Sequence, residues 1–233
     1  MKQKVVAIVL SAGKGTRMGA EVAKQYLLVN DKPVLYYTLQ AFEQSEVDEV
    51  VLVVSRGEEE YVTSNIVKKY GFQKVSKVIA GGKERYDSVY SGLQEIKEAS
   101  YVLIHDGARP CLTVDLLSRL IREVKVKEAC VAAVPVKDTI KVVNSSEEIV
   151  DTPLRDTLRM VQTPQAFSYS LIKRAYDLIM EQEHSFITDD AMVVEHVMSK
   201  RVYSVYGEYT NIKITTPEDL SIMRSFLEMQ HRI

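Results

Sequence analysis

An apolar, strand-like run that leads straight into a glycine-rich loop constrains this chain more than any other feature. Residues 5–9 are all apolar, and residues 10–19 read Leu-Ser-Ala-Gly-Lys-Gly-Thr-Arg-Met-Gly, a pattern that predicts a buried strand followed by a loop. Gly13 and Gly15 allow a tight turn whose successive backbone N–H groups can surround an anion. Three cations lie in or just beyond the loop: Lys14, Arg17 and Lys24. The segment therefore predicts a polyphosphate site.

Two familiar phosphate-binding patterns do not fit this loop. The Walker pattern requires Gly-x-x-x-x-Gly-Lys-Ser/Thr, but Lys14 is followed by a glycine. The dinucleotide pattern requires a glycine where Met18 stands and an acid after the second strand, whereas the apolar run 50–54 is followed by Ser-Arg. An oxidoreductase that uses a nicotinamide or flavin is therefore disfavoured. A plain turn with solvated cations stays open as an alternative, although Arg17 and Lys24 weaken it.

Strand-like apolar runs alternate with stretches of helical periodicity along most of the chain. We expect strands near residues 4–10, 48–55, 75–79, 100–105, 129–134 and 201–206, and helices near 33–44, 58–70, 85–97, 113–127, 168–182, 188–198 and 216–230. This alternation predicts an α/β fold, with a Rossmann-like, mostly parallel sheet and helices on both faces, and residues 1–233 are expected to form a single domain. Ligands of such sheets bind beyond the carboxyl ends of the strands, where the glycine loop, Gly81, Gly82 and Asp106 all fall.

The alternation breaks at residues 137–160, which are expected to form a β-arm that projects from the sheet. Residues 137–143 and 149–153 predict two strands on either side of the polar turn 144–148. Because a lone hairpin is only marginally stable in water, packing on a second subunit would steady it. A hairpin folded back on its own domain is the alternative that the sequence leaves open.

Charge and composition exclude several classes of protein. A formal net charge of −2 over 233 residues gives no general reason to expect nucleic-acid binding, and no apolar run approaches the roughly 20 residues of a membrane span. The apolar start is too short for a signal peptide, so a cytoplasmic protein is expected. Cys111 and Cys130 are too few and too far apart for a zinc cluster and are expected to be reduced. His105 is expected to make a structural hydrogen bond.

The loop, read as Leu-x-Ala-Gly-x-Gly-x-Arg-Met followed by Ala-Lys-Gln-Tyr, resembles that of the sugar nucleotidyltransferases. More narrowly, it is similar to the 2-C-methyl-D-erythritol 4-phosphate cytidylyltransferases of isoprenoid precursor synthesis. The resemblance recurs in six further blocks, in the family's order, at residues 81–89, 105–110, 136–139, 162–165, 188–191 and 211–213. Blocks in this order across nearly the whole chain make the resemblance specific.

The resemblance implies transfer of a cytidylyl group from CTP to 2-C-methyl-D-erythritol 4-phosphate, with release of pyrophosphate. Arg17, Lys24 and Lys213 would be the catalytic cations, and Mg²⁺ would bridge phosphate oxygens with Asp106 as its protein ligand. The residues implied for CTP are Ser11, Ala12, Gly13, Gly15, Gly82, Lys83, Arg85, Ser88 and Asp106. Those implied for the polyol phosphate are Asp106, Arg109, Thr139, Arg155, Thr163 and Lys213, with Arg159 as a substitute for Arg155 and Asp189 as a further candidate. Thr139 and Arg155 would come from the arm of the partner in a homodimer.

Two other functions stay open at the level of sequence. A cytidylyltransferase for ribitol 5-phosphate would share the glycine loop, the Asp-Gly-Ala-Arg-Pro block and the arm. Residues 155–165, Thr188 and Asp189 favour the methylerythritol substrate over it. A catalytically silent nucleotide-binding regulator could keep the fold but would not need Arg17, Lys24 and Lys213, so the presence of these cations argues against it.

Overall fold

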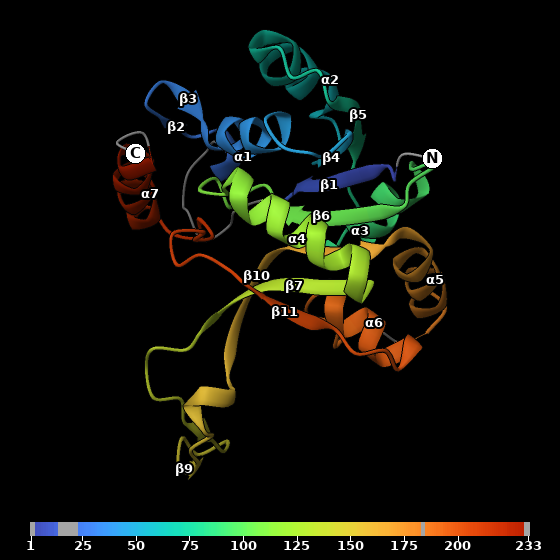
Figure 1. The fold of residues 1–233 in the computed structure, drawn as a ribbon. Coiled ribbons are helices and arrows are strands. Elements are labelled where there is room, and N and C mark those ends of the chain that lie inside the picture. The colour runs from blue at the N-terminus through green and yellow to red at the C-terminus, as the bar shows by residue number, and fades with distance from the viewer. Residues whose placement is uncertain (1–2, 14–22, 183–184, 231–233) are drawn as a thin grey trace.

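The structure, a computed structural model, describes residues 3–13, 23–182 and 185–230. Seven strands form one central sheet in the order β11-β7-β10-β6-β1-β4-β5, and helices cover both of its faces (Figure 1). The strands are β1 (Val5–Ser11), β4 (Glu49–Val54), β5 (Val75–Ala80), β6 (Tyr101–Asp106), β7 (Ala129–Pro135), β10 (Arg159–Ser168) and β11 (Tyr203–Tyr206). The helices are α1 (Val34–Glu43), α2 (Glu59–Val62), α3 (Arg85–Gln94), α4 (Val114–Lys127), α5 (Tyr169–Ile179), α6 (Asp190–Met198) and α7 (Glu218–Gln230).

The predicted α/β fold with a mostly parallel sheet is confirmed, with one strand that the sequence did not predict. All pairs in the sheet are parallel except those of β10, which runs antiparallel to β6 and β7. The polar run Gln162–Gln165 and its proline are unlike a central strand, because proline cannot donate to the ladder. The register of β10 on β7 shifts between Val161 and Gln165, and Pro164 lies within this break.

Side chains of β1 alternate between two separate cores, as a strand buried on both faces requires. Val5, Ala7 and Val9 pack with residues of α1, α2, α4 and α7. Val6 and Ile8 pack on the opposite face with residues of α3, α5 and α6. Each fully buried valine or isoleucine side chain stabilises the fold by about 1.5–3 kcal/mol. The central strands are therefore stable and hold the loops at their ends in place.

The register of the central strands brings three strand ends to one edge. Leu10 of β1 lies beside Asp106 of β6, and Ser11 lies beside Val54 of β4. The segments that follow these strands therefore share one end of the sheet, as predicted. A small hairpin of β2 (Leu28–Val29) and β3 (Lys32–Pro33) precedes α1 and was not predicted from the sequence.

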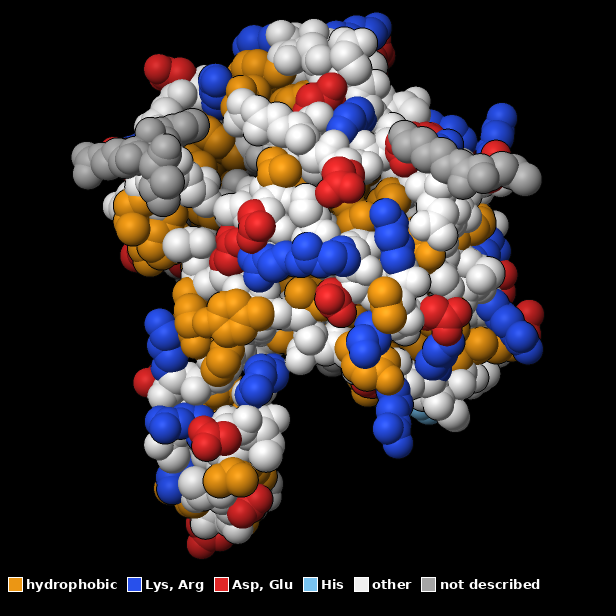
Figure 2. Space-filling model, viewed as in Figure 1, with side chains coloured by type: hydrophobic (Ala, Val, Ile, Leu, Met, Phe, Trp, Pro, Cys, Tyr) orange, Lys and Arg blue, Asp and Glu red, His pale blue; other side chains and the backbone are white. Residues whose placement is uncertain are grey.

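Residues 137–158 extend away from the sheet (Figure 1), and the predicted end of the arm at residue 160 is wrong by two residues, because Arg159 and Met160 already pair with β7 as the start of β10. The strands here, β8 (Val142–Val143) and β9 (Ile149–Asp151), are shorter than predicted and pair antiparallel. All side chains from 137 to 152 are exposed, and apolar ones appear on the surface of the arm in Figure 2. The exposed apolar residues include Ile140, Val142, Val143, Ile149, Val150 and Leu154.

Candidate functional site

A pocket of about 1080 Å³ lies at the carboxyl edge of the sheet. Its walls come from the ends of β1, β4 and β6, the segment after β5, and the 3₁₀-helix η2 (Lys24–Tyr26). This is the edge at which ligands of parallel sheets bind. The predicted site residues that line the pocket are Ser11, Ala12, Gly13, Lys24, Gly82, Lys83, Arg85, Ser88, Asp106 and Lys213.

Asp106, the last residue of β6, is the centre of the charged groups. Its Oδ1 accepts a hydrogen bond from Arg85 Nε at 3.2 Å, and its Oδ2 accepts one from Lys213 Nζ at 2.7 Å. Burial alone would raise the pKa of Asp106, but the charges of Arg85 and Lys213 outweigh it and hold that pKa well below its usual range. The pocket therefore contains a carboxylate that is ionised at every physiological pH.

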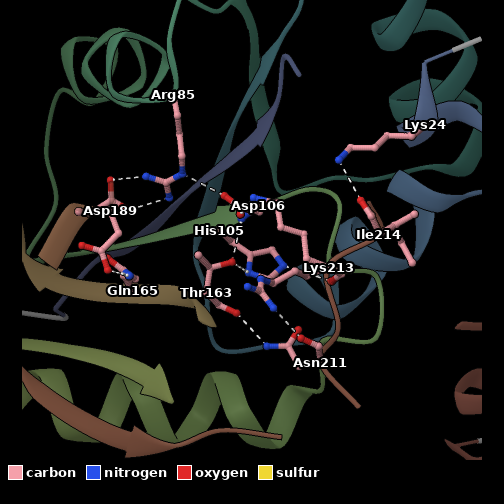
Figure 3. Close-up of polar contacts among 12 residues, drawn as sticks. Lys24, Arg85, His105, Asp106, Thr163, Gln165, Asp189, Asn211, Lys213 and Ile214 are labelled. Atoms are coloured by element: carbon pink, nitrogen blue, oxygen red, sulfur yellow. Dashed lines mark hydrogen bonds and ion pairs between the residues drawn. The ribbon is translucent and has the colours of Figure 1, made fainter. Parts of the chain in front are cut away.

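Lys24 and Lys213 reach the pocket from opposite ends of the chain. Lys24 Nζ donates to the backbone carbonyl of Ile214 at 2.8 Å, the residue next to Lys213 (Figure 3). Gln25 fixes this turn, since its side-chain amide donates to the carbonyl of Ser11 at 3.0 Å and is itself buried. Two ammonium-bearing side chains are thus held beside the end of β1.

Gly81 and Gly82 pack too closely against their neighbours to carry side chains. A Cβ on Gly82 would lie 2.2 Å from Asp87 Cβ, and one on Gly81 would lie 2.7 Å from Ala12 Cβ. Ser88 fixes the same turn, because its Oγ accepts from the N–H of Gly82 and donates to the carbonyl of Glu84, both at 3.1 Å. The backbone of residues 81–82 is therefore presented to the pocket in a fixed position.

A buried pair behind the pocket holds the backbone of Asp106. Thr163 Oγ1 accepts from the N–H of Asp106 at 3.0 Å and lies 3.0 Å from His105 Nδ1. Burial lowers the pKa of His105 to about 3, so the neutral ring can accept from Thr163 while Nε2 faces the carbonyl of Arg109 at 3.3 Å. The structural role expected for His105 agrees with these contacts. Thr163, predicted to bind substrate, does not line the pocket and directs its hydroxyl inward.

Asn211 connects Arg109 to β10. The fully buried Asn211 donates through its side-chain Nδ2 to the backbone carbonyl of Thr163 at 2.8 Å. The backbone carbonyl of Asn211 accepts from Arg109 Nη1, also at 2.8 Å. Arg109 Nε and Ser11 Oγ are buried without a hydrogen-bond partner among the described residues. Buried polar groups of this kind are usually satisfied. Ser11 lines the pocket and Arg109 is not among the described residues that do, so Ser11 Oγ is the atom better placed to meet a ligand.

Several predicted residues lie away from the pocket or outside the described residues. Gly15 and Arg17 fall outside the described residues. Thr139 and Arg155 are exposed on the arm, where Arg155 Nη1 donates to the carbonyl of Lys137 at 3.3 Å. Asp189 caps α6, with its side chain accepting from the N–H of Met192.

Other residues at the site were not predicted from the sequence. Ser55 and Arg56 line the pocket from the end of β4, the position at which the dinucleotide pattern requires an acid. Asp190, inside the recognised block 188–191, is fully buried and receives Arg85. In the sequence, the only sign of this role was an acidic residue near the predicted start of the helix.

The described residues contain neither a cluster of metal ligands nor a helix suited to a membrane. No three His, Cys, Asp or Glu side chains in residues 3–13, 23–182 and 185–230 are grouped so that they could hold a metal ion. Within these same ranges, none of the helices combines the length and apolar character needed to cross a bilayer.

Comparison with known proteins identifies close relatives over nearly the whole chain. Residues 5–229 match the family model described as IspD: 2-C-methyl-D-erythritol 4-phosphate cytidylyltransferase. The chain is 50% identical over 225 residues to the 2-C-methyl-D-erythritol 4-phosphate cytidylyltransferase of Lachnoclostridium phytofermentans, covering 97% of each chain. It is 51% identical over 224 residues to the enzyme of that name from Lachnospira eligens, covering 95% of this chain and 98% of the relative.

Solved structures of the same kind are similar in fold. The crystal structure of 4-diphosphocytidyl-2C-methyl-D-erythritol synthase from Anaerococcus prevotii superposes with a TM-score of 0.85 at 31% identity, covering 97% of this chain and 99% of the other. That of 2-C-methyl-D-erythritol 4-phosphate cytidylyltransferase from Thermus thermophilus gives a TM-score of 0.77 at 28% identity, covering 95% and 98%.

Proposed function

This chain belongs to the 2-C-methyl-D-erythritol 4-phosphate cytidylyltransferase family, and we propose that the pocket at the carboxyl edge of its sheet is where it joins CTP to 2-C-methyl-D-erythritol 4-phosphate. The products are CDP-methylerythritol and pyrophosphate, in the non-mevalonate route to isoprenoid precursors. The observation that carries this proposal is the convergence of Lys24, Lys213, Arg85 and Asp106 on one pocket in a chain of this family.

The reaction needs charge control rather than a general base. The nucleophile is a phosphate monoester whose second pKa is about 6, so it is already an anion at neutral pH. The barrier comes from bringing one anion to the α-phosphate of another. Positioning and neutralisation of charge are therefore the tasks of the protein.

Lys24 and Lys213 are suited to hold the triphosphate. Both residues line the pocket, and Lys24 Nζ donates at 2.8 Å to the carbonyl of Ile214, the residue next to Lys213. Each ammonium has three N–H donors, so each would keep its protein acceptor, donate to a phosphate oxygen as well, and stabilise the charge that develops at the α-phosphorus. Arg17, from the glycine loop, is proposed as a third cation.

The backbone of Gly81 and Gly82 is suited to recognise the base. Main-chain carbonyls can accept from the amino group of cytosine, whereas uracil presents a carbonyl at that position. Ser88, which bonds Gly82 and Glu84, holds this backbone in place. Ser11 Oγ, buried and unpartnered among the described residues, is a further donor for the nucleotide.

The residues present fit a Mg²⁺ ion bound partly by Asp106 and partly by phosphate oxygens of the nucleotide. Asp106 accepts two hydrogen bonds, and a carboxylate has about four lone-pair directions, so it keeps capacity for a metal. Mg²⁺ commonly takes one or two carboxylates and completes its shell with phosphate oxygens and water. When bound, the ion would neutralise and orient the phosphates.

The arm supports a homodimer in which the partner completes the site for the polyol phosphate. Its exposed apolar side chains, such as Ile149 at 62% and Leu154 at 71% exposure, would be covered by a second copy of the chain. Thr139 and Arg155 would then reach the partner's pocket. We also propose a cytoplasmic location, in keeping with the two free, buried thiols.

Pyrophosphate release tests the function. The assay contains CTP and Mg²⁺ with either 2-C-methyl-D-erythritol 4-phosphate or ribitol 5-phosphate, and a parallel series replaces CTP by UTP. We expect release with CTP and the methylerythritol substrate only. Pyrophosphate release with ribitol 5-phosphate alone would overturn the proposed substrate. No release with any pair of substrates would overturn the proposed function.

A further inference from the structure

The carboxylate of Asp190 is the most deeply buried charged group near the pocket. It lies at the first residue of α6 and is 0% exposed. Arg85 Nη1 donates to its Oδ1 at 2.9 Å, and Arg85 Nη2 donates to its Oδ2 at 2.8 Å. Tyr176 adds a third hydrogen bond to Oδ1 at 2.6 Å. A bidentate pair of this kind fixes the plane of the guanidinium group as well as its distance.

Arg85 contacts Asp106 through Nε, a different nitrogen from the two that bind Asp190. With both Nη atoms held by Asp190, only Nε is directed to Asp106, at 3.2 Å from Oδ1. Lys213 therefore keeps Oδ2 of Asp106 at 2.7 Å. Figure 3 shows Arg85 reaching across to Asp106 from the helix above it. Without Asp190, the whole fork of Arg85 would be free to chelate Asp106 and displace Lys213.

The start of α6 is fastened to the strand beside Asp106. Gln165 of β10 accepts from the N–H of Ala191 and donates to Asp189, both at 2.9 Å. Gln165 lies opposite Ile104 in the register of β10 on β6, the strand that ends at Asp106. Burial and the charge of Asp190 raise the pKa of Tyr176 well above its usual value, so Tyr176 remains a donor to Asp190. The position of Asp190 is thus set by two elements of the core.

We infer that Asp190 is a positioning residue for the cytidylyl transfer. It holds Arg85 by both Nη atoms, so that only the Nε–H of Arg85 reaches Asp106. The rest of the Asp106 carboxylate then stays available to Lys213 and to the bound nucleotide. The inference rests on the proposed function of the pocket. Asp190 does not line the pocket, so it acts through Arg85 and not by touching substrate.

A double-mutant cycle tests this role. We would compare the wild type, Asp190→Asn, Arg85→Gln and the double variant by kcat and KM for CTP, and by thermal unfolding. Asp190→Asn keeps the shape of the side chain but removes its charge and one acceptor. We expect kcat to fall about 10-fold to 100-fold, as misplacement of a site group by about 1 Å does, with a smaller change in KM. In the Arg85→Gln background the same substitution should change kcat less than threefold, because its target is gone.

Asp177→Asn is a matched control, since it removes an ion pair with Lys173 on the exposed side of α5. It should leave kcat unchanged. If Asp190→Asn does not fold, Tyr176→Phe is the second variant. It retains the ion pair but removes the hydrogen bond that holds Asp190 Oδ1, so the carboxylate holds Arg85 less firmly and kcat should fall by threefold or more. Equal losses from Asp190→Asn in both backgrounds, or wild-type kcat in either folded variant, would overturn the positioning role. A wild-type enzyme that releases no pyrophosphate would instead overturn the proposed function, and this inference with it.

Discussion

Replacing Gly82 by alanine should disable the pocket by moving the start of α3. The new Cβ would lie 2.2 Å from Asp87 Cβ, whereas ordinary contact begins at 3.4 Å, so the two must separate by about 1.2 Å. Rotating a side chain cannot relieve this contact, because backbone atoms of Asp87 lie at 3.1 and 3.2 Å. Arg85 begins the same helix and would move with it. A displacement of about 1 Å reduces catalysis by about 10²-fold, which corresponds to about 2.7 kcal/mol.

The assay is pyrophosphate release at varied CTP, with the free energy of unfolding measured in parallel. Gly92→Ala is the matched control, since it also introduces a clash on α3 but meets Ile8 Cγ2 at 2.8 Å in the core. Overpacking should destabilise both variants by about 1–3 kcal/mol. Only Gly82→Ala should lose about 10²-fold in kcat/KM. Losses in kcat/KM that are equal in the two variants, or a Gly82→Ala value within threefold of the wild type, would refute the reasoning.

Three further predictions concern the cations, the arm and the thiols. Lys24→Met and Lys213→Met should each lower kcat by about 10²–10³-fold with little change in melting temperature, and near-wild-type turnover would contradict the charge-neutralisation account. Arg155→Ala should raise KM for the polyol phosphate, and mixed dimers with Lys213→Met should recover activity; inactive mixed dimers, shown to form, would argue against a shared site. Burial raises the pKa of Cys111 and Cys130 to about 12, so a thiol reagent at pH 8 should label both only after unfolding, and rapid labelling of the folded protein would count against this packing.

Much of the fold could be predicted because its central strands are buried on both faces. Continuous apolar runs such as residues 50–54 and 129–134 follow directly from that burial and were found at nearly their observed bounds. β10 could not be found in this way. Its buried polar residues Gln162, Thr163 and Gln165 make hydrogen bonds to Glu208, Asp106 and Asp189, so partners distant in sequence compensate for a composition that does not resemble a strand.

Within the candidate site, too, some residues could be predicted from local sequence and others depend on partners distant in the chain. Gly82 and Asp106 stand at the ends of strand-like runs and Lys24 stands just beyond the glycine loop. Topology then brings the three residues to one edge. Asp190 and His105 act behind the pocket, and their contacts depend on which strands are neighbours. No local pattern contains that information. The arm was predicted from a break in alternation, but its own sequence does not determine what covers its exposed apolar side chains.

A crystal structure with CTP and Mg²⁺ bound would test the central claim most directly. The account predicts that the triphosphate lies between Lys24 Nζ and Lys213 Nζ, within hydrogen-bond distance of both, with the cytosine against the backbone of Gly81 and Gly82. A nucleotide bound outside this pocket, or one whose phosphates contact neither lysine, would contradict it.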